Sequence, residues 1–290
     1  MMSSALLGAL AALSWGTHDF FARFPSRGVG PLATVLIVTF AGLVFLSIWL
    51  FASGGEVRFL WPSMWLVALT GVAYALATLS LFAALAQGPI SIVAPIAGSY
   101  PALAVIFALT QGARPGIVQW AAIVAVSAGV AIVSRSGGRY EKSGDIAPGK
   151  LPAVLMLAFG ASLGFAVGLT AGQYAVPVFG EAETAWLARC FGLATVVAIW
   201  LAMPKSAVPV RWLPVLSLMG LLDVTALLLI VTAGNLPDPA MATVASSGFG
   251  AVAVVWARIF LKESIAPIQL VGMAMVFGGV AVLAGGAAFF

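Results

Sequence analysis

Apolar residues fill ten long runs of this chain, and polar residues gather in the short segments between the runs. A helix that crosses a bilayer needs about 20 consecutive, mainly apolar residues, and each run has about that length. The pattern therefore predicts ten transmembrane helices. The runs cover residues 4–24, 32–52, 65–86, 90–110, 116–134, 151–172, 184–203, 213–234, 239–260 and 267–289.

The two halves of the chain match each other at a constant offset of 150 residues, without a gap. Matched positions that carry the same residue include Leu13 and Leu163, Gly42 and Gly192, Pro89 and Pro239, and Gln119 and Gln269. Each half then has five helices, and because five is an odd number the second half enters the membrane from the opposite side. Inverted repeats are a common plan of secondary transporters, which bind their substrate near the bilayer midplane between the repeats.

A polar stretch near the middle of the chain separates the two halves. It reads Arg-Ser-Gly-Gly-Arg-Tyr-Glu-Lys-Ser-Gly-Asp at residues 135–145. We predict a first five-helix repeat at 1–137, a polar linker at 138–149 and a second, inverted five-helix repeat at 150–290. The predicted fold is an all-α integral membrane protein with ten transmembrane helices around a central cavity. The first run lacks the basic start and the cleavage site of a secretory signal, so we interpret it as the first membrane helix.

Composition supports the membrane class and removes several others. Hydrophobic residues make up 62% of the chain and charged residues 8%, against about 25% charged residues in a soluble domain. The single cysteine, Cys190, excludes an internal disulfide and a cysteine-built metal site. The sequence has no Walker-type phosphate loop and no HExxH motif, so we expect no catalytic residues, no metal and no cofactor. Its basic residues form no patch interleaved with aromatic residues, and we expect no nucleic acid as a partner.

Short motifs in both halves resemble the EamA-type repeats of the drug/metabolite transporter superfamily. In the second half these are Lys262-Glu263-Ser264, Pro267, Gln269, Gly272 and Gly278-Gly279-Val280, and in the first half they are Ser14-Trp15-Gly16, Ser99-Tyr100-Pro101, Gln119 and Gly129-Val130. The resemblance covers the whole chain as two tandem repeats. It implies ten helices around a central cavity, and export or exchange of small metabolites, often amino acids. Within the superfamily the chain resembles the YddG-like branch of aromatic amino acid exporters.

Two residues of the family pattern occur in one half only. Pro101 is matched by Ala251 in the other repeat, and Glu263 is matched by Ala113. We therefore interpret the proline as the cause of a helix kink and the glutamate as a charge at a helix end, rather than as groups that perform chemistry.

A His–Asp pair, His18 and Asp19, lies toward the end of the first predicted helix, about one turn from Arg23. An ionisable group at the bilayer centre costs about 2.5–3.5 kcal/mol on insertion scales. One interpretation places the pair at the interface, where the helix meets water. The other places His18 on the same helix face as Ser14 and Trp15 and makes it a substrate contact. We expect the pair to mark the wet end of the helix, at the mouth of the cavity.

Two further charges fall inside predicted helices. Asp223 lies about ten residues into the run 213–234, near the midplane if that run is a spanning helix. It is either a hydrogen-bonded carboxyl that joins two helices or a group that binds an amine or couples transport to protons. Arg189 either snorkels to the interface, or pairs with Glu181 and Glu183, or binds a substrate carboxylate, since a guanidinium fork matches that geometry.

Aromatic residues supply the next candidates for substrate contact. Trp15, Tyr74, Tyr100 and Phe165 fall on helices that we expect to line the cavity, and Thr78 shares a helix face with Tyr74. A cavity with aromatic walls and few fixed charges suits flat amphipathic or aromatic solutes. The alternative for each aromatic residue is simple packing against lipid or protein.

A small polar segment, Ser246-Ser247-Gly248, lies in the ninth run. It is either a polar patch of the cavity or a site of close helix packing. The predicted substrate-binding residues are Trp15, His18, Tyr74, Thr78, Tyr100, Phe165, Arg189 and Ser246, with Asp223 as the coupling candidate.

Basic residues are divided unevenly between the two ends of the predicted bundle. Loops on the side of the termini hold only Arg58 and Arg114, and the loops opposite hold the other basic loop residues. The positive-inside rule then places the termini outside the cell, whereas the family resemblance implies cytoplasmic termini. Both orientations stay open.

These patterns favour a secondary transporter over the other membrane classes. We expect it to export or exchange small metabolites, amino acids (aromatic or other neutral) foremost, by alternating access. The cavity would be lined by the runs that begin at residues 4, 65, 90, 151, 213 and 239. An uncoupled facilitator or channel, or a multidrug or lipid flippase, is the alternative, and a membrane-embedded enzyme is a distant third. We expect a monomer in the bacterial inner (plasma) membrane, with the substrate and the lipid bilayer as its partners.

Overall fold

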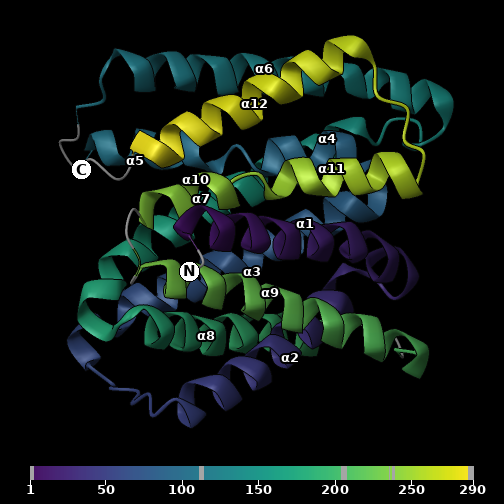
Figure 1. Ribbon diagram of the computed structural model, residues 1–290. Helices are drawn as coiled ribbons and strands as arrows, with labels where there is room; N and C mark the ends of the chain where they lie inside the picture. Colours follow the sequence, from purple (N-terminus) through teal and green to yellow (C-terminus); the bar gives the residue numbers. More distant parts are fainter. Residues whose placement is uncertain (1–2, 111–113, 204–207, 235, 237–238, 287–290) are drawn as a thin grey trace.

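The computed structural model describes residues 3–110, 114–203, 208–234, 236 and 239–286, and all regular elements among them are helices (Figure 1). The first half contains α1 (Ser4–Gly28), α2 (Pro31–Ala52), η1 (Trp61–Ser63), α3 (Met64–Gln87), α4 (Ile90–Ala97), α5 (Tyr100–Thr110) and α6 (Ile117–Ser143). The second half contains α7 (Leu151–Phe179), α8 (Glu181–Ala202), η2 (Val210–Trp212), α9 (Leu213–Gly234), α10 (Pro239–Ser246), α11 (Phe249–Phe260) and α12 (Pro267–Gly286).

The all-α membrane fold is confirmed. Among the described residues, eight helical segments are long and apolar enough to cross a membrane, and a shorter apolar segment covers Val244–Phe260. The remaining span is α1, a helix of 25 residues whose apolar run is interrupted by His18, Asp19 and Arg23. Each half thus contributes five spans.

The fourth and ninth spans are each broken into two helices, where the sequence predicted a helix kinked at Pro101 over 90–110 and a continuous helix over 239–260. The breaks lie between α4 and α5 and between α10 and α11, at Gly98 and Gly248, which the offset of 150 residues relates. At each break a serine hydroxyl donates to the carbonyl three residues earlier, from Ser99 to Ile96 at 2.7 Å and from Ser247 to Val244 at 2.6 Å. Such local bonds compete with the helical ladder, and they end the helix before Pro101 is reached.

A second difference concerns the end of the fifth span. The apolar run predicted a helix at 116–134, but α6 continues to Ser143 and so includes the first part of the polar stretch. It stops where Gly144 adopts a φ of 85°, a left-handed conformation that glycine tolerates and that commonly ends helices. The last residues of the predicted run 267–289 lie outside the described part of the chain.

Helix packing follows the two-fold relation between the repeats. α1 packs on α9 as its counterpart α7 packs on α3, and α1 packs on α10 and α11 as α7 packs on α4 and α5. Likewise, α2 packs on α9 as α8 packs on α3. α6 and α12, the fifth span of each repeat, lie together along one edge of the molecule, and α2 lies at the opposite edge (Figure 1). α1, α3, α7 and α9 occupy the middle, where the site is built.

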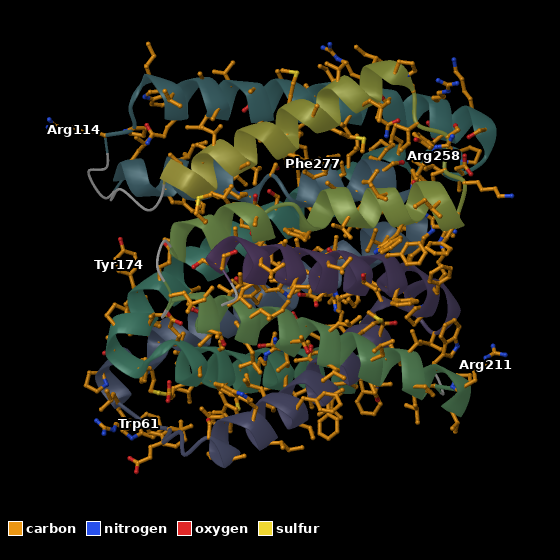
Figure 2. All side chains as sticks on the ribbon, viewed as in Figure 1. Trp61, Arg114, Tyr174, Arg211, Arg258 and Phe277 are labelled. Atoms are coloured by element: carbon orange, nitrogen blue, oxygen red, sulfur yellow. The ribbon has the colours of Figure 1, made fainter. Side chains whose placement is uncertain are left out.

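The two ends of the bundle carry different side chains. Arg211 and Arg258 project from one end, and Arg114, Tyr174 and Trp61 project from the other (Figure 2). The connection from α11 to α12 lies at the first of these ends (Figure 1). We call the end that carries Arg211 and Arg258 the basic end.

Glycines allow α6 and α12 to cross closely. A Cβ at Gly129 would lie 2.5 Å from the Gly272 carbonyl oxygen and 2.9 Å from Cγ2 of Val276. We expect Gly129→Ala to force the two helices apart and to lower the stability of the purified protein by about 1–3 kcal/mol. Gly278→Ala on α12 is the matched control, because among the described residues no atom outside its own stretch of helix lies within 4 Å of its Cβ position. Thermal unfolding in detergent measures both, and an equal loss in the control would show that the crossing is not the cause.

Candidate functional site

An ion pair joins α8 and α9 inside the membrane-spanning region. Arg189 Nη2 donates to Asp223 Oδ2 at 2.6 Å, and Trp15 Nε1 of α1 donates to Asp223 Oδ1 at 2.9 Å. Both carboxylate oxygens are therefore engaged, and three helices are tied together at one carboxylate. The side chains of Arg189 and Asp223, here called the charged pair, keep 17% and 26% of their surface exposed. The charged pair is therefore only partly buried.

The neighbouring helix α2 makes room for this arrangement. A Cβ at Gly42 would lie 2.7 Å from Nη1 of Arg189, so a larger residue there would displace the guanidinium. Among the ion pairs of the described residues, Arg189 pairs with Asp223 and not with Glu181 or Glu183. Of the sequence-based alternatives for Asp223, a carboxyl that joins helices is observed; its binding and coupling roles stay predictions.

Five aromatic side chains form a continuous row beside the charged pair. The ring centroids of Tyr74 and Phe165 lie 5.7 Å apart, and those of Phe165 and Tyr100 lie 6.0 Å apart. Tyr100 stacks on Phe249 at 6.5 Å, and Phe249 meets Trp15 edge-on at 6.4 Å. These distances are typical of favourable aromatic pairs. The aromatic row thus runs from α3 to α1, where Trp15 links it to Asp223.

Four members of the aromatic row were predicted from the sequence, and Phe249 was missed. The residues of the aromatic row and the charged pair lie on seven helices: α1, α3, α5, α7, α8, α9 and α11. All of these except α8 belong to the six runs expected to line the cavity. Phe249 follows Gly248 at the α10–α11 break, much as Tyr100 follows Gly98 at the other break. The repeat offset, applied to the residues next to Tyr100, could have found it.

Two half-helices begin at members of the aromatic row. Tyr100 is the first residue of α5, and Phe249 is the first residue of α11. Helix N-termini carry a partial positive charge, and discontinuous helices in transporters commonly aim such ends at anionic groups of the substrate. The Tyr100 and Phe249 rings therefore lie at helix N-termini whose partial positive charge favours anions.

The His–Asp pair lies in the protein interior, so the expectation of a wet helix end is wrong. His18 and Asp19 are both buried, and α1 continues for a further nine residues after Asp19, to Gly28. His18 Nδ1 lies 2.9 Å from Asp19 Oδ1, and the imidazole lies 5.7 Å from the ring of Phe82 on α3. This contact pairs one ring nitrogen with one carboxylate oxygen, and buried polar groups are generally hydrogen-bonded in this way.

The EamA-like transporter family model matches this chain twice, at residues 2–135 and 152–285. The chain belongs to the EamA-like transporter family. A solved structure described only as a crystal structure of a protein superposes on this EamA-like chain with a TM-score of 0.65, 19% identity and 98% coverage of both chains, which shows the fold alone. The curated proteins contain no match. These findings establish a multi-pass membrane protein of a transporter family, and they do not support the narrower YddG-like branch.

The site of this EamA-like protein does not repeat its charges. The repeat counterparts of Arg189 and Asp223 are Thr39 and Ala73, and the counterpart of Asp19 is Leu169. The charged pair therefore has no charged counterpart in the first half of the chain.

Two predicted contacts lie at the margin of this arrangement. Thr78 is half-buried on α3, one turn after Tyr74. Ser246 is buried and is the last residue of α10, directly before the break. Their roles as substrate contacts stay predictions.

Proposed function

We propose that this EamA-like protein is a secondary transporter that exports or exchanges small metabolites by alternating access in the bacterial inner membrane. Its proposed substrates are amino acids with neutral, foremost aromatic, side chains. The observation that carries the proposal is the charged pair beside the aromatic row.

A zwitterionic amino acid matches both parts of this site. Its carboxylate would bind the Arg189 guanidinium, its ammonium group would bind the Asp223 carboxylate, and its side chain would lie against Phe165 and Tyr100. Each charge of the protein then exchanges one partner for another. Breaking a buried ion pair without replacement costs several kcal/mol, so a solute that offers both charges is strongly favoured over one that offers a single charge.

The test is tracer counterflow in proteoliposomes that contain the purified protein. We expect saturable counterflow of labelled phenylalanine and tryptophan, weaker counterflow of threonine, and none of a cationic dye. Arg189→Gln should reduce the phenylalanine signal at least about tenfold, because truncating one partner of a buried charge pair costs about 2–5 kcal/mol. Arg114→Gln is the matched control, since Arg114 projects from the end of the bundle opposite to the basic end (Figure 2).

The same assay separates the alternatives. Counterflow of the dye alone would contradict the amino acid proposal and favour a multidrug exporter. Absence of counterflow for all four solutes, in protein that remains monodisperse, would contradict this substrate class and move the choice to other solutes, and then to a channel or flippase.

Asp223 is also the proposed coupling group. The substrate ammonium group and a proton would compete for its carboxylate, so that release of one allows the other to bind. We expect a pH gradient to drive amino acid accumulation by the wild type and not by Asp223→Asn. Accumulation that ignores the gradient in the wild type would contradict coupling through Asp223.

A further inference from the structure

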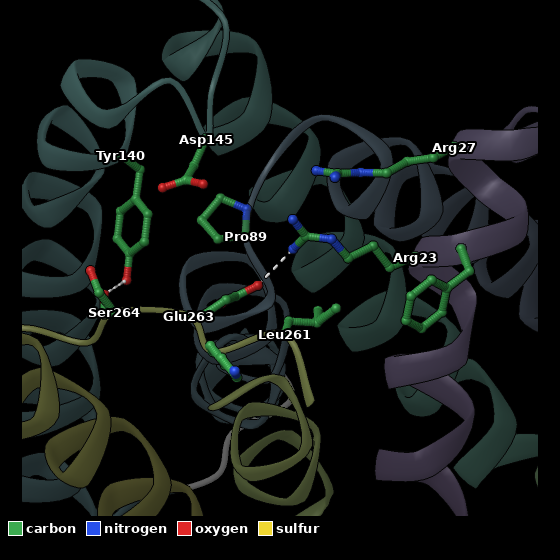
Figure 3. A pocket seen from close by; sticks show the side chains of 10 residues that line it. Arg23, Arg27, Pro89, Tyr140, Asp145, Leu261, Glu263 and Ser264 are labelled. Atoms are coloured by element: carbon green, nitrogen blue, oxygen red, sulfur yellow. Dashed lines mark hydrogen bonds and ion pairs between the residues drawn. The ribbon is translucent and has the colours of Figure 1, made fainter. Parts of the chain in front are cut away.

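A second buried charge cluster lies at the connection between α11 and α12, where Figure 3 shows the ion pair of Arg23 and Glu263. Glu263, in the connection between α11 and α12, accepts hydrogen bonds from Arg23 Nη1 at 2.6 Å and from the backbone N–H groups of Ile90 and Ser91, each at 3.0 Å. Arg23 Nη1 also donates to the Gly88 carbonyl at 3.2 Å. We call Arg23, Ile90, Ser91 and Glu263 the Glu263 cluster.

The Glu263 cluster joins the two repeats. Arg23 belongs to α1, and Ile90 and Ser91 form the N-terminus of α4, so both partners of Glu263 lie in the first repeat while Glu263 lies in the second. A carboxylate that caps a helix N-terminus is stabilised by the helix dipole as well as by its hydrogen bonds. Here one buried carboxylate therefore holds α1 and α4 against the start of α12.

A network of neutral hydrogen bonds reinforces the same contact. The Tyr140 hydroxyl of α6 lies 2.7 Å from the Ser264 carbonyl oxygen and 3.0 Å from Gln269 Oε1. Gln269 Nε2 of α12 donates to the Ser91 carbonyl at 3.0 Å, and Ser91 Oγ lies 3.1 Å from the Tyr140 hydroxyl. Three of these four contacts join the first half of the chain to the second, so the halves cannot separate here without breaking them.

Neither charged residue of the Glu263 cluster has a charged counterpart at the offset of 150 residues. The sequence counterpart of Glu263 is Ala113, which lies outside the described residues, and the counterpart of Arg23 is Gln173. Near the start of α1, at the other end of that helix, Gly8 packs against Ala242 of α10 so closely that a Cβ would overlap its backbone. That contact is made by small apolar residues. Opening the contact between Gly8 and Ala242 costs only dispersion contacts. Opening the Glu263 cluster leaves a carboxylate, a guanidinium and two backbone amides without their partners.

A cavity of about 300 Å³ adjoins the cluster. Its lining includes Arg23, Arg27, Asp145, Lys262 and Glu263. Water that enters from this cavity can solvate the charged groups once they part. The charged groups that join the two repeats therefore lie beside a space large enough to admit water.

We propose that the Glu263 cluster is a one-sided gate of the transporter, which closes the basic end between the repeats and biases the empty protein toward opening at the other end. This inference rests on the proposed alternating access. Arg23 and Glu263 act as positioning residues, because they set which end of the pathway opens and do not touch the substrate.

The test reads the opening of the gate without any substrate. Ser26 lies three residues after Arg23 on α1 and is 2% exposed, and its hydroxyl has no hydrogen-bond partner among the described residues. Ser26→Cys therefore reports on separation of α1 with little disturbance. In a Cys190→Ser background, the rate of reaction with a membrane-impermeant maleimide is measured in detergent. We expect Glu263→Gln to raise this rate about tenfold or more, since a buried charge pair is lost.

Matched variants distinguish a gate from a structural contact. Asp145→Asn is the control, because Asp145 lines the same cavity, and we expect its labelling rate to match the parent. The exchange Arg23→Glu with Glu263→Arg should not restore slow labelling, since an arginine cannot accept the α4 amide hydrogens. Should Glu263→Gln not fold, Arg23→Gln carries the same test and keeps the α4 cap intact.

The outcomes separate this inference from the proposed function. Unchanged labelling in Glu263→Gln or Arg23→Gln, or equally fast labelling in Asp145→Asn, would overturn the gate. Restored slow labelling in the exchanged pair would reduce the cluster to a simple ion pair. Fast labelling without amino acid counterflow would support the gate and contradict the substrate proposal.

Discussion

Asp223→Leu should destabilise the protein more than any other single substitution in the proposed site. The change leaves the Arg189 guanidinium without its 2.6 Å partner and removes the acceptor of Trp15. Removing one member of a buried ion pair costs about 3–5 kcal/mol, and the partial exposure of this pair places the expected loss near 3 kcal/mol. Thermal unfolding in detergent measures the loss.

The double variant Arg189→Met with Asp223→Leu is the decisive companion. Replacing both charges by apolar groups of similar size removes the desolvation cost, so most of the lost stability should return. Counterflow of phenylalanine should nevertheless stay absent, because no charge is left for either end of the amino acid. If the double variant transports phenylalanine, the charged pair is structural and the proposed substrate site is wrong.

Phe165→Ala should change which amino acids are transported. Phe165 stands in the middle of the aromatic row, between Tyr74 and Tyr100. Loss of one ring contact with an aromatic side chain is worth about 0.5–1.5 kcal/mol beyond the lost burial. We expect the KM for phenylalanine and tryptophan to rise by about tenfold or more, and the KM for threonine to change little.

The control for this variant lies on the same helix. Phe159 of α7 is exposed on the outer surface, and Phe159→Ala should leave all three KM values near those of the wild type. Equal losses for threonine and phenylalanine in Phe165→Ala would mean that the ring supports the fold of the site and not its selectivity.

The spans and the repeat could be predicted because they follow from composition along the chain. Runs of about 20 apolar residues have one stable form in a bilayer, and the offset of 150 residues is a property of the sequence itself. A kink was predicted at Pro101, beside the first break, but the exact break at Gly98 and the whole break at Gly248 were not predicted. Each depends on one serine hydroxyl that donates to a carbonyl and competes with an otherwise helical run. The signal, a Ser next to Gly within an apolar run, also occurs where helices merely pack.

The individual site residues could be predicted better than their partners. The sequence identified three site residues as polar or aromatic groups within apolar runs: Arg189, Asp223 and Trp15. No sequence pattern predicts that α8, α9 and α1 meet, because that depends on how the helices pack. His18 and Asp19 illustrate the same limit. The sequence placed them near the end of a run, whereas only packing against Phe82 shows that α1 carries them inside the protein.

The Glu263 cluster shows most clearly that the sequence predicts a residue better than its partner. Glu263 was predicted as a charge at a helix end, and it does cap a helix. The capped helix, however, is α4 of the other repeat, 172 positions away in sequence from Glu263 at Ser91. Charge at a helix terminus is a local rule, and which terminus lies within reach is decided by the packing of the whole chain.

The most direct test of the account is competition against phenylalanine counterflow by its two single-charge analogues. Phenethylamine lacks the carboxylate that Arg189 would bind, and 3-phenylpropionate lacks the ammonium group that Asp223 would bind. If the charged pair and the aromatic row hold a zwitterion, each analogue inhibits labelled phenylalanine at least about tenfold more weakly than unlabelled phenylalanine does, since one buried charge stays unpaired. Inhibition by either analogue as strong as that of phenylalanine would contradict the proposed site.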